Sequence, residues 1–233
     1  MEYDQRATRL AGSGMYSYFN QTNLFFLQQR ERQLTQLLKA IRFDNFSYKR
    51  ILEIGCGGGG VLLNFLSYGA HSEQLFGIDL LHERLRSASA QLAGSKFANA
   101  DGQKLPFLPD EFDLLLQFTA FSSVLDQQVK QNMATEMLRV LKPDGAILWY
   151  DFWLNPTNRH TRGIRPAESR RLFPNGRLEF RRITLAPPLT RRLIHLSWIL
   201  CQALEKITLF NTHYLALIHT QPVPMQRPMR HQR

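Results

Sequence analysis

Short apolar runs alternate with amphipathic segments through the middle of the chain. Most of the apolar runs between residues 49 and 152 are followed by a segment whose apolar positions recur every three or four residues. Such runs are typical of strands buried on both faces, and the longer period is typical of helices. The expected strands are ILEI (51–54), LFGIDL (75–80), KFANAD (96–101), FDLLLQF (112–118) and AILWYDF (146–152). Repeated strand–helix units predict an α/β fold with a parallel sheet and helices on both faces.

Different patterns mark the two ends of the chain. Apolar residues recur at roughly helical spacing between Leu24 and Ile41, with Gln and Arg between them. Residues 1–48 are therefore predicted to form a helical segment, and we expect it to act as a lid. Residues 221–233 hold three prolines, three arginines and no apolar run, which predicts a disordered tail.

The region from 153 to 220 shows a looser pattern. The expected elements are a short helix near 166–173, a strand near 178–185, a helix over 189–209 and a strand over 213–219. One face of the third element would hold Leu189, Leu193, Leu196, Leu200, Leu204 and Ile207. Core packing is the default prediction for that face. Further apolar residues, Trp198 among them, make the apolar face wider than one core contact needs. The segment could therefore instead cover a lipophilic acceptor or contact a membrane surface.

Composition limits the class of protein. The chain has 233 residues, of which 44% are hydrophobic and 21% charged, and this suits one globular domain. Two cysteines, Cys56 and Cys201, exclude a disulfide framework and fit a reducing compartment. No cluster with metal-ligand spacing occurs, so no metal is expected. The first residues lack an apolar stretch typical of a secretory signal, so a cytoplasmic location is expected.

Charge is concentrated in one segment. The formal net charge is +10, and ten arginines fall between Arg159 and Arg192 with only two acidic residues among them. An anionic small molecule or an anionic lipid headgroup would suit this segment. A solvated cationic face is an equal alternative. RNA is less favoured, because aromatic residues are not interleaved as in a single-strand stacking platform.

A glycine-rich turn follows the first strand. Residues 55–60 match the pattern GxGxxG, which places backbone close to a ligand. Glu53 lies two residues before Gly55, where its carboxylate would repel the pyrophosphate of a dinucleotide. S-adenosylmethionine presents an ammonium and a sulfonium cation instead. The order Glu-Ile-Gly-Cys-Gly therefore favours S-adenosylmethionine as the cofactor.

Four motifs together resemble the class I S-adenosylmethionine-dependent methyltransferases. These are LEIGCGGGG (52–60), GIDL (77–80), ANADGQKLPF (98–107), and FDLLLQF (112–118) with LRVLKPDG (138–145). The last of them resembles the small-molecule, type 11-like branch. Other stretches, such as LWYDFWLNP, resemble a bacterial subgroup that accompanies surface-polysaccharide or secondary-metabolite biosynthesis. The resemblance implies a Rossmann-like, mostly parallel seven-stranded sheet with an antiparallel last strand.

The resemblance also implies which residues hold the cofactor. Asp79 would accept hydrogen bonds from both ribose hydroxyls, and Asp101 would accept one from the adenine amino group. Gly102 would let the backbone pass beside the ring. The complete set expected to bind the cofactor is Glu53, Gly55, Cys56, Gly57, Asp79, Leu80, Asp101, Gly102 and Gln117. Cys56 is expected to be a small residue facing the cofactor rather than a nucleophile, since no basic partner is evident nearby.

The implied reaction moves a methyl group from sulfonium to an acceptor atom. The candidate catalytic residues are Tyr150, Asp151 and His160, of which the histidine suits proton abstraction near neutral pH. Alternatively, Tyr150 is a packed aromatic residue and His160 is a solvent-exposed histidine in a loop. After the fourth strand the chain reads Gln-Phe-Thr-Ala, not the (N/D)PP(Y/F) motif of many nucleic-acid and protein amine methyltransferases. This departure disfavours methylation of a base or an amide nitrogen.

These observations predict an enzyme that methylates a small molecule. The expected acceptor atom is an oxygen of a glycan, glycolipid or natural product. Residues 49–220 would form the methyltransferase domain, with residues 153–212 on the acceptor side. The alternatives are an RNA or protein methyltransferase that uses the basic surface, a non-catalytic cofactor-binding scaffold, and, disfavoured by Glu53, an NAD-dependent oxidoreductase. Peripheral contact with the inner membrane surface stays open, and the sequence does not indicate an oligomeric state.

Overall fold

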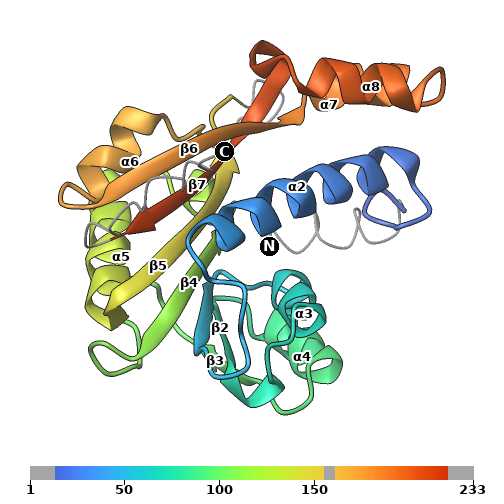
Figure 1. Ribbon diagram of the computed structural model, residues 1–233. Coiled ribbons are helices and arrows are strands. Elements are labelled where there is room, and N and C mark those ends of the chain that lie inside the picture. The colour runs from blue at the N-terminus through green and yellow to red at the C-terminus, as the bar shows by residue number, and fades with distance from the viewer. Residues whose placement is uncertain (1–13, 155–160, 220–233) are drawn as a thin grey trace, which may run out of the picture.

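A seven-stranded sheet organises the molecule (Figure 1). The computed structural model describes residues 14–154 and 161–219, so the predicted tail lies outside the described residues. The strands are β1 (Ile51–Ile54), β2 (Leu75–Asp79), β3 (Lys96–Asn99), β4 (Phe112–Phe118), β5 (Leu141–Phe152), β6 (Arg177–Leu185) and β7 (Asn211–His219). Their order is β3-β2-β1-β4-β5-β7-β6, and only β7 pairs antiparallel with its neighbours. The predicted mostly parallel sheet with an antiparallel last strand is confirmed.

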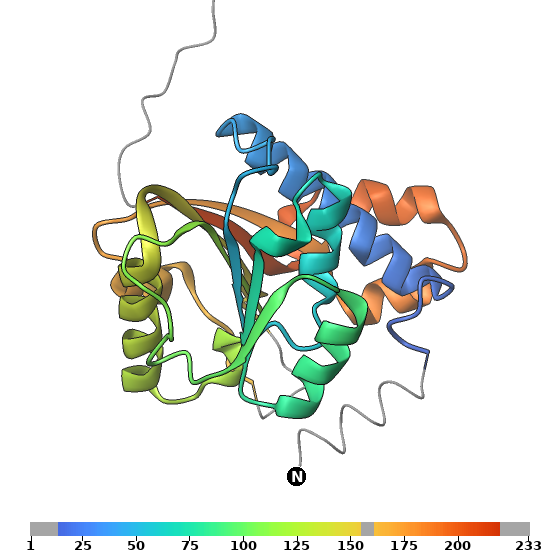
Figure 2. The same ribbon diagram turned by 90° about the horizontal axis from the view of Figure 1, so that it is seen from below.

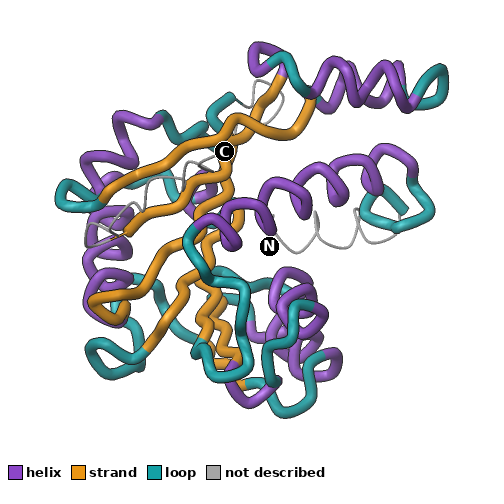
Figure 3. Tube along the Cα trace, in the orientation of Figure 1, coloured by secondary structure: helices purple, strands orange, loops and turns teal. Residues whose placement is uncertain are grey.

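Helices cover both faces of the sheet, as Figures 2 and 3 show. The structure contains α2 (Gln21–Ala40), α3 (Gly60–Ser67), α4 (His82–Gln91), α5 (Gln127–Val140), α6 (Pro166–Leu172), α7 (Pro187–Leu193) and α8 (Trp198–Glu205). The first three pack on one face and α5 and α6 on the other. Because of this double cover, every residue of β1 and β4 is buried. The continuous apolar runs in these strands therefore reflect burial on two sides.

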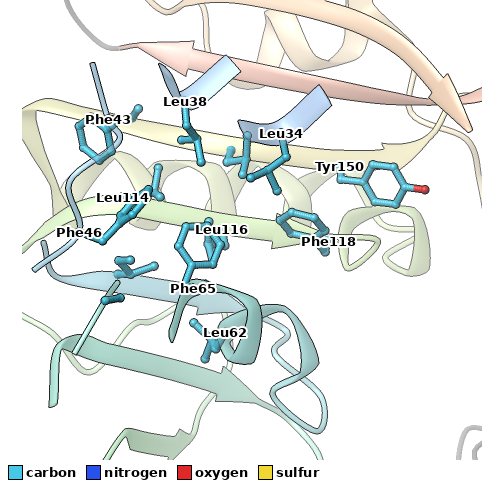
Figure 4. Packing of buried hydrophobic residues seen from close by; sticks show 14 of the residues in the cluster. Leu34, Leu38, Phe43, Phe46, Leu62, Phe65, Leu114, Leu116, Phe118 and Tyr150 are labelled. Carbon is cyan, nitrogen blue, oxygen red and sulfur yellow. The ribbon is translucent and has the colours of Figure 1, made fainter. Parts of the chain in front are cut away.

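The core under α2 includes residues from distant parts of the chain (Figure 4). Leu34 and Leu38 of α2 join Phe65 of α3 and Leu114 and Leu116 of β4 in one buried cluster. Asn20 begins α2 by accepting hydrogen bonds from the backbone N–H groups of the two residues at 22 and 23. The helical part of the predicted lid segment is thus part of the core, and a lid role stays a prediction for the residues before it.

The prediction of a single helix over 189–209 was wrong. The segment forms two helices, α7 and α8, and Ser197 caps the second by accepting a hydrogen bond from the Leu200 N–H at 3.2 Å. The interruption changes the helical phase. As a result Leu196, Leu200 and Ile207, which were expected on the packed face, are exposed. Trp198 and Cys201 face inward instead, with Trp198 edge-on to Phe25 at a centroid distance of 5.2 Å.

Residues 142–145, whose sequence Lys-Pro-Asp-Gly is typical of a turn, lie inside β5. The strand begins at Leu141, which pairs with Phe112, and the regular register resumes where Leu114 pairs with Ala146. Because residues 142–145 form no regular pairs with β4, this stretch is an irregularity at the start of the strand. Lys142 lies in the stretch and forms an ion pair with Asp113 of β4 at 2.9 Å.

Candidate functional site

The glycine turn is tied to the end of β2 by Asp79. One carboxylate oxygen of Asp79 accepts the Gly57 N–H at 2.9 Å, and the other accepts the Leu81 N–H at 2.9 Å. The turn needs positive φ at Gly55 (71°) and Gly57 (54°), which glycine adopts without strain. A Cβ added at Gly57 would meet no heavy atom within 4 Å, so there is space for a ligand beside the turn. The carboxyl ends of β1 and β2 thus present a fixed carboxylate and an open stretch of backbone.

Cys56 lies within the turn, and its thiol points inward. A Cβ added at Gly77 of β2 would come within 2.7 Å of the Cys56 Sγ, so the sulfur packs on that strand. Burial, Glu53 and Asp79 together raise the pKa of the thiol far above its ordinary range. A thiol that stays protonated is a poor nucleophile. Cofactor contact at this position stays a prediction.

Glu53 is a buried carboxylate that lacks a full set of partners. It is 2% exposed, and its Oε2 has no hydrogen-bond partner among the described residues. Burial raises its pKa well above the ordinary value of 4.5, against the attraction of Arg30. A buried acceptor without a donor is costly unless a ligand satisfies it. Because this oxygen lies beside the glycine turn, the residues fit the cationic amino-acid end of S-adenosylmethionine.

The residues expected to surround adenine lie on the neighbouring loops. Asp101 is exposed, and it accepts hydrogen bonds from the Gln103 backbone N–H (2.9 Å) and side-chain amide (3.0 Å). Gly102 is buried, and a Cβ there would lie 3.0 Å from the Met133 Cε. Leu80 is 69% exposed although it is apolar. An exposed apolar side chain and a carboxylate next to a close backbone approach are suited to a flat, amino-bearing ring.

Asn99 is a residue of this region that the sequence reasoning missed. Its side-chain amide donates to the backbone carbonyls of Asp79 and Leu80, both at 2.9 Å. It therefore holds the end of β2 against the end of β3. Its position near the end of the expected third strand was the available signal, and in the sheet it lies opposite Asp79.

Gln117 and Asp151 form a buried pair at the ends of β4 and β5. The Asp151 carboxylate accepts hydrogen bonds from the Gln117 side chain (3.0 Å), the Ser122 N–H (3.1 Å) and the Phe152 N–H (2.8 Å). Both side chains are almost inaccessible to solvent, and burial raises the pKa of Asp151 to about 6. The Gln117 Oε1 has no partner among the described residues. This arrangement fixes the amide of Gln117, and its free oxygen adds a second unsatisfied acceptor to the site.

Tyr150 belongs to an aromatic and cationic cluster above the sheet. Its hydroxyl lies 2.8 Å from the Thr184 Oγ1, and its ring stacks on His213 with a centroid distance of 4.8 Å and an angle of 7°. The Arg30 guanidinium lies over the rings of Phe118 (5.6 Å) and Tyr150 (5.8 Å). Figure 4 shows Phe118 and Tyr150 at the same end of the cluster. Tyr150 is thus packed, with burial raising its pKa.

Arg30 and His213 are functional candidates that the sequence reasoning missed. Arg30 comes from α2, and its buried Nε has no partner among the described residues. His213 begins β7 next to the end of β5, where it pairs with Phe152. His213 stands at the start of the predicted last strand, and this position could have identified it as a candidate. Nothing in the sequence around Arg30 indicates a functional role. His160, predicted as a base, lies outside the described residues.

Two strained residues flank this cluster. Thr119, directly after β4, has φ 60°, and Thr184 in β6 has φ 67°. Such angles are rare for a β-branched residue and cost about 1–3 kcal/mol each. Thr119 N–H donates to the Tyr150 carbonyl at 2.8 Å, and Thr184 meets the Tyr150 hydroxyl. Strain of this kind concentrates at functional sites, and here it borders the carboxyl edge of the sheet.

His213 gives the first prediction, on acid stability. Burial and the nearby Arg30 lower its pKa from 6.5 to about 3 in the folded protein. Since the unfolded chain binds a proton more readily below pH 6.5, the stability from the neutral imidazole is lost as pH falls through that value. We expect wild type to lose about 1 kcal/mol more than His213→Phe for each pH unit between 6 and 4. Urea titrations at several pH values would measure this. Equal acid sensitivity of the two proteins would contradict it, and His195→Phe, at an exposed site, is the control.

A groove between α2 and α3 is separate from these residues. It has a volume of about 410 Å³ and is lined by Tyr18, Leu24, Leu27, Gln28, Glu31, Arg32 and Asn64. None of the predicted cofactor residues lines it. Residues 14–154 and 161–219 contain no group of three or more side chains that could hold a metal ion. Within the same ranges, no helix is both long and apolar enough to span a bilayer.

Comparisons with known proteins agree with this geometry. Residues 51–145 match a protein family described as a methyltransferase domain. A phthiotriol/phenolphthiotriol dimycocerosates methyltransferase of Mycobacterium leprae is 33% identical over 117 residues, 49% of this chain and 41% of that protein. The sterol 4-C-methyltransferase of Caenorhabditis elegans is 34% identical over 113 residues, 43% of this chain and 30% of that protein. The chain therefore spans less than half the length of these two relatives.

The fold is also similar to solved structures. A SAM-dependent methyltransferase from Archaeoglobus fulgidus superimposes with a TM-score of 0.57 and 13% identity, covering 83% of this chain and 98% of that one. The matched segment, 51–145, contains the glycine turn, Asp79, Asp101 and Gln117. The cofactor that these comparisons indicate is S-adenosylmethionine. Residues 51–145 thus form a methyltransferase domain, and the chain has the fold of the class I, S-adenosylmethionine-dependent methyltransferases.

Proposed function

We propose that this protein transfers a methyl group from S-adenosylmethionine to an oxygen of a small acceptor, a glycan, glycolipid or natural product. The observation that carries the proposal is the buried, partly unsatisfied Glu53 beside an open glycine turn that Asp79 fixes. The names of relatives that act on phthiotriol dimycocerosates and on a sterol support a lipophilic acceptor. Residues 49–220 form the catalytic domain in this proposal, with 153–212 on the acceptor side. The protein would act in the cytoplasm.

Each predicted cofactor residue has a role in this proposal. Asp79 binds the ribose hydroxyls, and Glu53 with Gln117 accepts from the ammonium group. Arg30 pairs with the carboxylate of the cofactor, because its Nε is buried and has no hydrogen-bond partner among the described residues. Leu80 and the backbone of Gly102, with Asp101, surround the adenine. The glycines at 55 and 57 and the small Cys56 leave room for the amino-acid end.

In this reaction the main task of the protein is to orient the acceptor relative to the methyl group. Bound S-adenosylmethionine supplies a methyl group that its own positive charge activates. The protein must align the acceptor with that methyl group and exclude water. We propose Asp151 as a positioning residue, because its three hydrogen bonds hold Gln117 and the turn after β4. Tyr150 and His213 form the wall that orients the acceptor, and His160 is the proposed base.

The cofactor assignment is tested by calorimetric titration with S-adenosylmethionine and, separately, with NAD. We expect micromolar binding of the first and no binding of the second. Acceptors are then screened by transfer of an isotope-labelled methyl group from the cofactor to glycans, glycolipids and natural products. Binding of NAD alone would overturn the proposal. Labelled RNA as the only product would favour the alternative that uses the basic segment, and salt-sensitive RNA binding would accompany it.

A further inference from the structure

An unusual set of exposed apolar side chains lies at one end of the molecule. In the α7–α8 connection and the first turn of α8, Leu196 is 79% exposed, Ile199 76% and Leu200 43%. In the turn before α2, Tyr16 and Tyr18 are more than half exposed and Phe19 is 98% exposed. We call these six residues the distal tip. Contiguous apolar surface of this kind marks an interaction site rather than ordinary surface.

The two parts of the distal tip are held side by side. Trp198 packs on Phe25 at 5.2 Å, and Glu205 pairs with Arg32 at 2.7 Å, so α8 lies along α2 in the same direction. The starts of both helices therefore point the same way. Figure 2 shows the α7–α8 connection near the turn before α2, and in Figure 1 both lie on the same side of the molecule. One face of α8 is used in this packing, and the exposed residues are on the other.

Charge around the distal tip has one sign. Arg191 and Arg192 lie in the last turn of α7, one helical turn before Leu196, and both are exposed. The one acidic residue between 187 and 210, Glu205, is already paired with Arg32. Residues 14–24 contain no charged side chain. Residues 14–24 and 187–210 therefore combine aliphatic, aromatic and cationic groups, and the one carboxylate among them is paired.

We propose that the distal tip docks on an anionic membrane surface. Aliphatic side chains enter the headgroup boundary, tyrosines suit the interface, and arginines attract acidic lipids. A second copy of this chain fits less well, because it would bring the same arginines to the same contact. The tip extends from the β6–β7 connection, where Leu185 pairs with Asn211 at the edge that also holds Asp151 and His213. The inference rests on the proposed function in one respect: a lipophilic acceptor explains why this surface adjoins the site.

Vesicle flotation of the full chain tests the proposal. The probes are vesicles of phosphatidylcholine alone and of phosphatidylcholine mixed with phosphatidylglycerol. We expect binding to the mixed vesicles, weaker in high salt. Leu196→Ser with Ile199→Ser should lower binding more than tenfold, and Arg191→Gln with Arg192→Gln should lower it roughly thirtyfold, at about one kcal/mol per arginine. All four positions are exposed, so these changes leave the fold intact.

Matched controls separate the tip from general positive charge. Arg170→Gln with Arg171→Gln changes a similar exposed pair at the end of α6, and Leu108→Ser changes a leucine that is 73% exposed elsewhere. Neither control should alter vesicle binding by more than about twofold. An equal effect of both arginine pairs, or no binding to mixed vesicles, would overturn the proposal. So would dimerisation in sedimentation velocity that Leu196→Ser abolishes without any vesicle binding. Because flotation needs no cofactor, its failure is distinct from failure of the proposed methyl transfer, which calorimetry reports.

Discussion

Asp79→Ala is expected to lower the affinity for S-adenosylmethionine by about a hundredfold or more. The carboxylate accepts the Gly57 and Leu81 N–H groups at 2.9 Å each, so it both shapes the glycine turn and presents its oxygens at the end of β2. A hydrogen bond to a charged group contributes about 1.5–3 kcal/mol. Loss of the two bonds that we propose from the ribose hydroxyls to Asp79 therefore corresponds to roughly two to four orders of magnitude in affinity. Calorimetric titration measures the loss directly.

Two further variants make this result interpretable. Asp144→Ala, at an exposed position near the start of β5 and so at the opposite edge of the sheet from Asp79, should leave the affinity unchanged. Asp79→Asn keeps the size of the side chain and one acceptor oxygen, so we expect an intermediate loss of about tenfold. Thermal unfolding of each variant checks that the domain remains folded at the titration temperature. Near-wild-type affinity of a folded Asp79→Ala would refute the assignment of this residue to the cofactor.

Glu53→Gln is expected to change stability and binding in opposite directions. Wild type buries a carboxylate whose Oε2 has no partner among the described residues, and burial raises its pKa well above 4.5. The variant removes this buried charge, so the protein without cofactor should be more stable by about 1–2 kcal/mol at neutral pH. The same change removes the attraction for an ammonium group. Affinity for S-adenosylmethionine should therefore fall by about tenfold or more.

The pH dependence gives this prediction its sign. Because the carboxyl group has a raised pKa in the folded state, wild type loses stability as pH rises above 4.5, the range in which the unfolded chain ionises. The stability difference from Glu53→Gln should therefore grow from acid toward neutral pH. Affinity for the cationic cofactor should rise over the same range in wild type and stay flat in the variant. Glu73→Gln, an exposed counterpart, should show neither trend. A destabilised variant with unchanged affinity would show that the carboxylate serves the fold alone.

Local patterns predicted most of the sheet. The bounds of β1 and β4 agree with the sequence prediction residue for residue, because both strands are short apolar runs covered on two faces. The helical region after β6 was harder. Apolar residues recur at helical spacing on both sides of Ser197, so the sequence pattern predicts one continuous helix. The end of α7 and the start of α8 become evident only from the hydrogen bond by which Ser197 caps α8. The register irregularity at 142–145 likewise depends on pairing with β4, which a single segment does not reveal.

The candidate site also contains residues that the sequence could predict and residues that it could not. The glycine turn, Asp79 and Asp101 are adjacent in sequence to strand ends, so their spacing was informative. Arg30 and His213 reach Tyr150 from α2 and β7, more than a hundred residues apart in sequence from one another. Tertiary packing alone brings them together. The buried contacts of Asp151 also depend on three segments, so its raised pKa had no local sign.

The attachment of α7 and α8 has a consequence for how such proteins diversify. Both ends of this insertion leave the sheet at one point, where Leu185 pairs with Asn211 and the Ala186 N–H donates to the Phe210 carbonyl at 2.8 Å. Because both ends of the segment meet at this one pair of residues, another helical hairpin or a tight turn could replace it without changing the register of β6 and β7. A replacement would need a hydrophobic partner for Phe25, which Trp198 now covers, and an acidic partner for Arg32, which is now Glu205. Because we propose that residues 153–212 lie on the acceptor side, we expect a graft at residues 186–210 to change acceptor preference while preserving the cofactor-binding half.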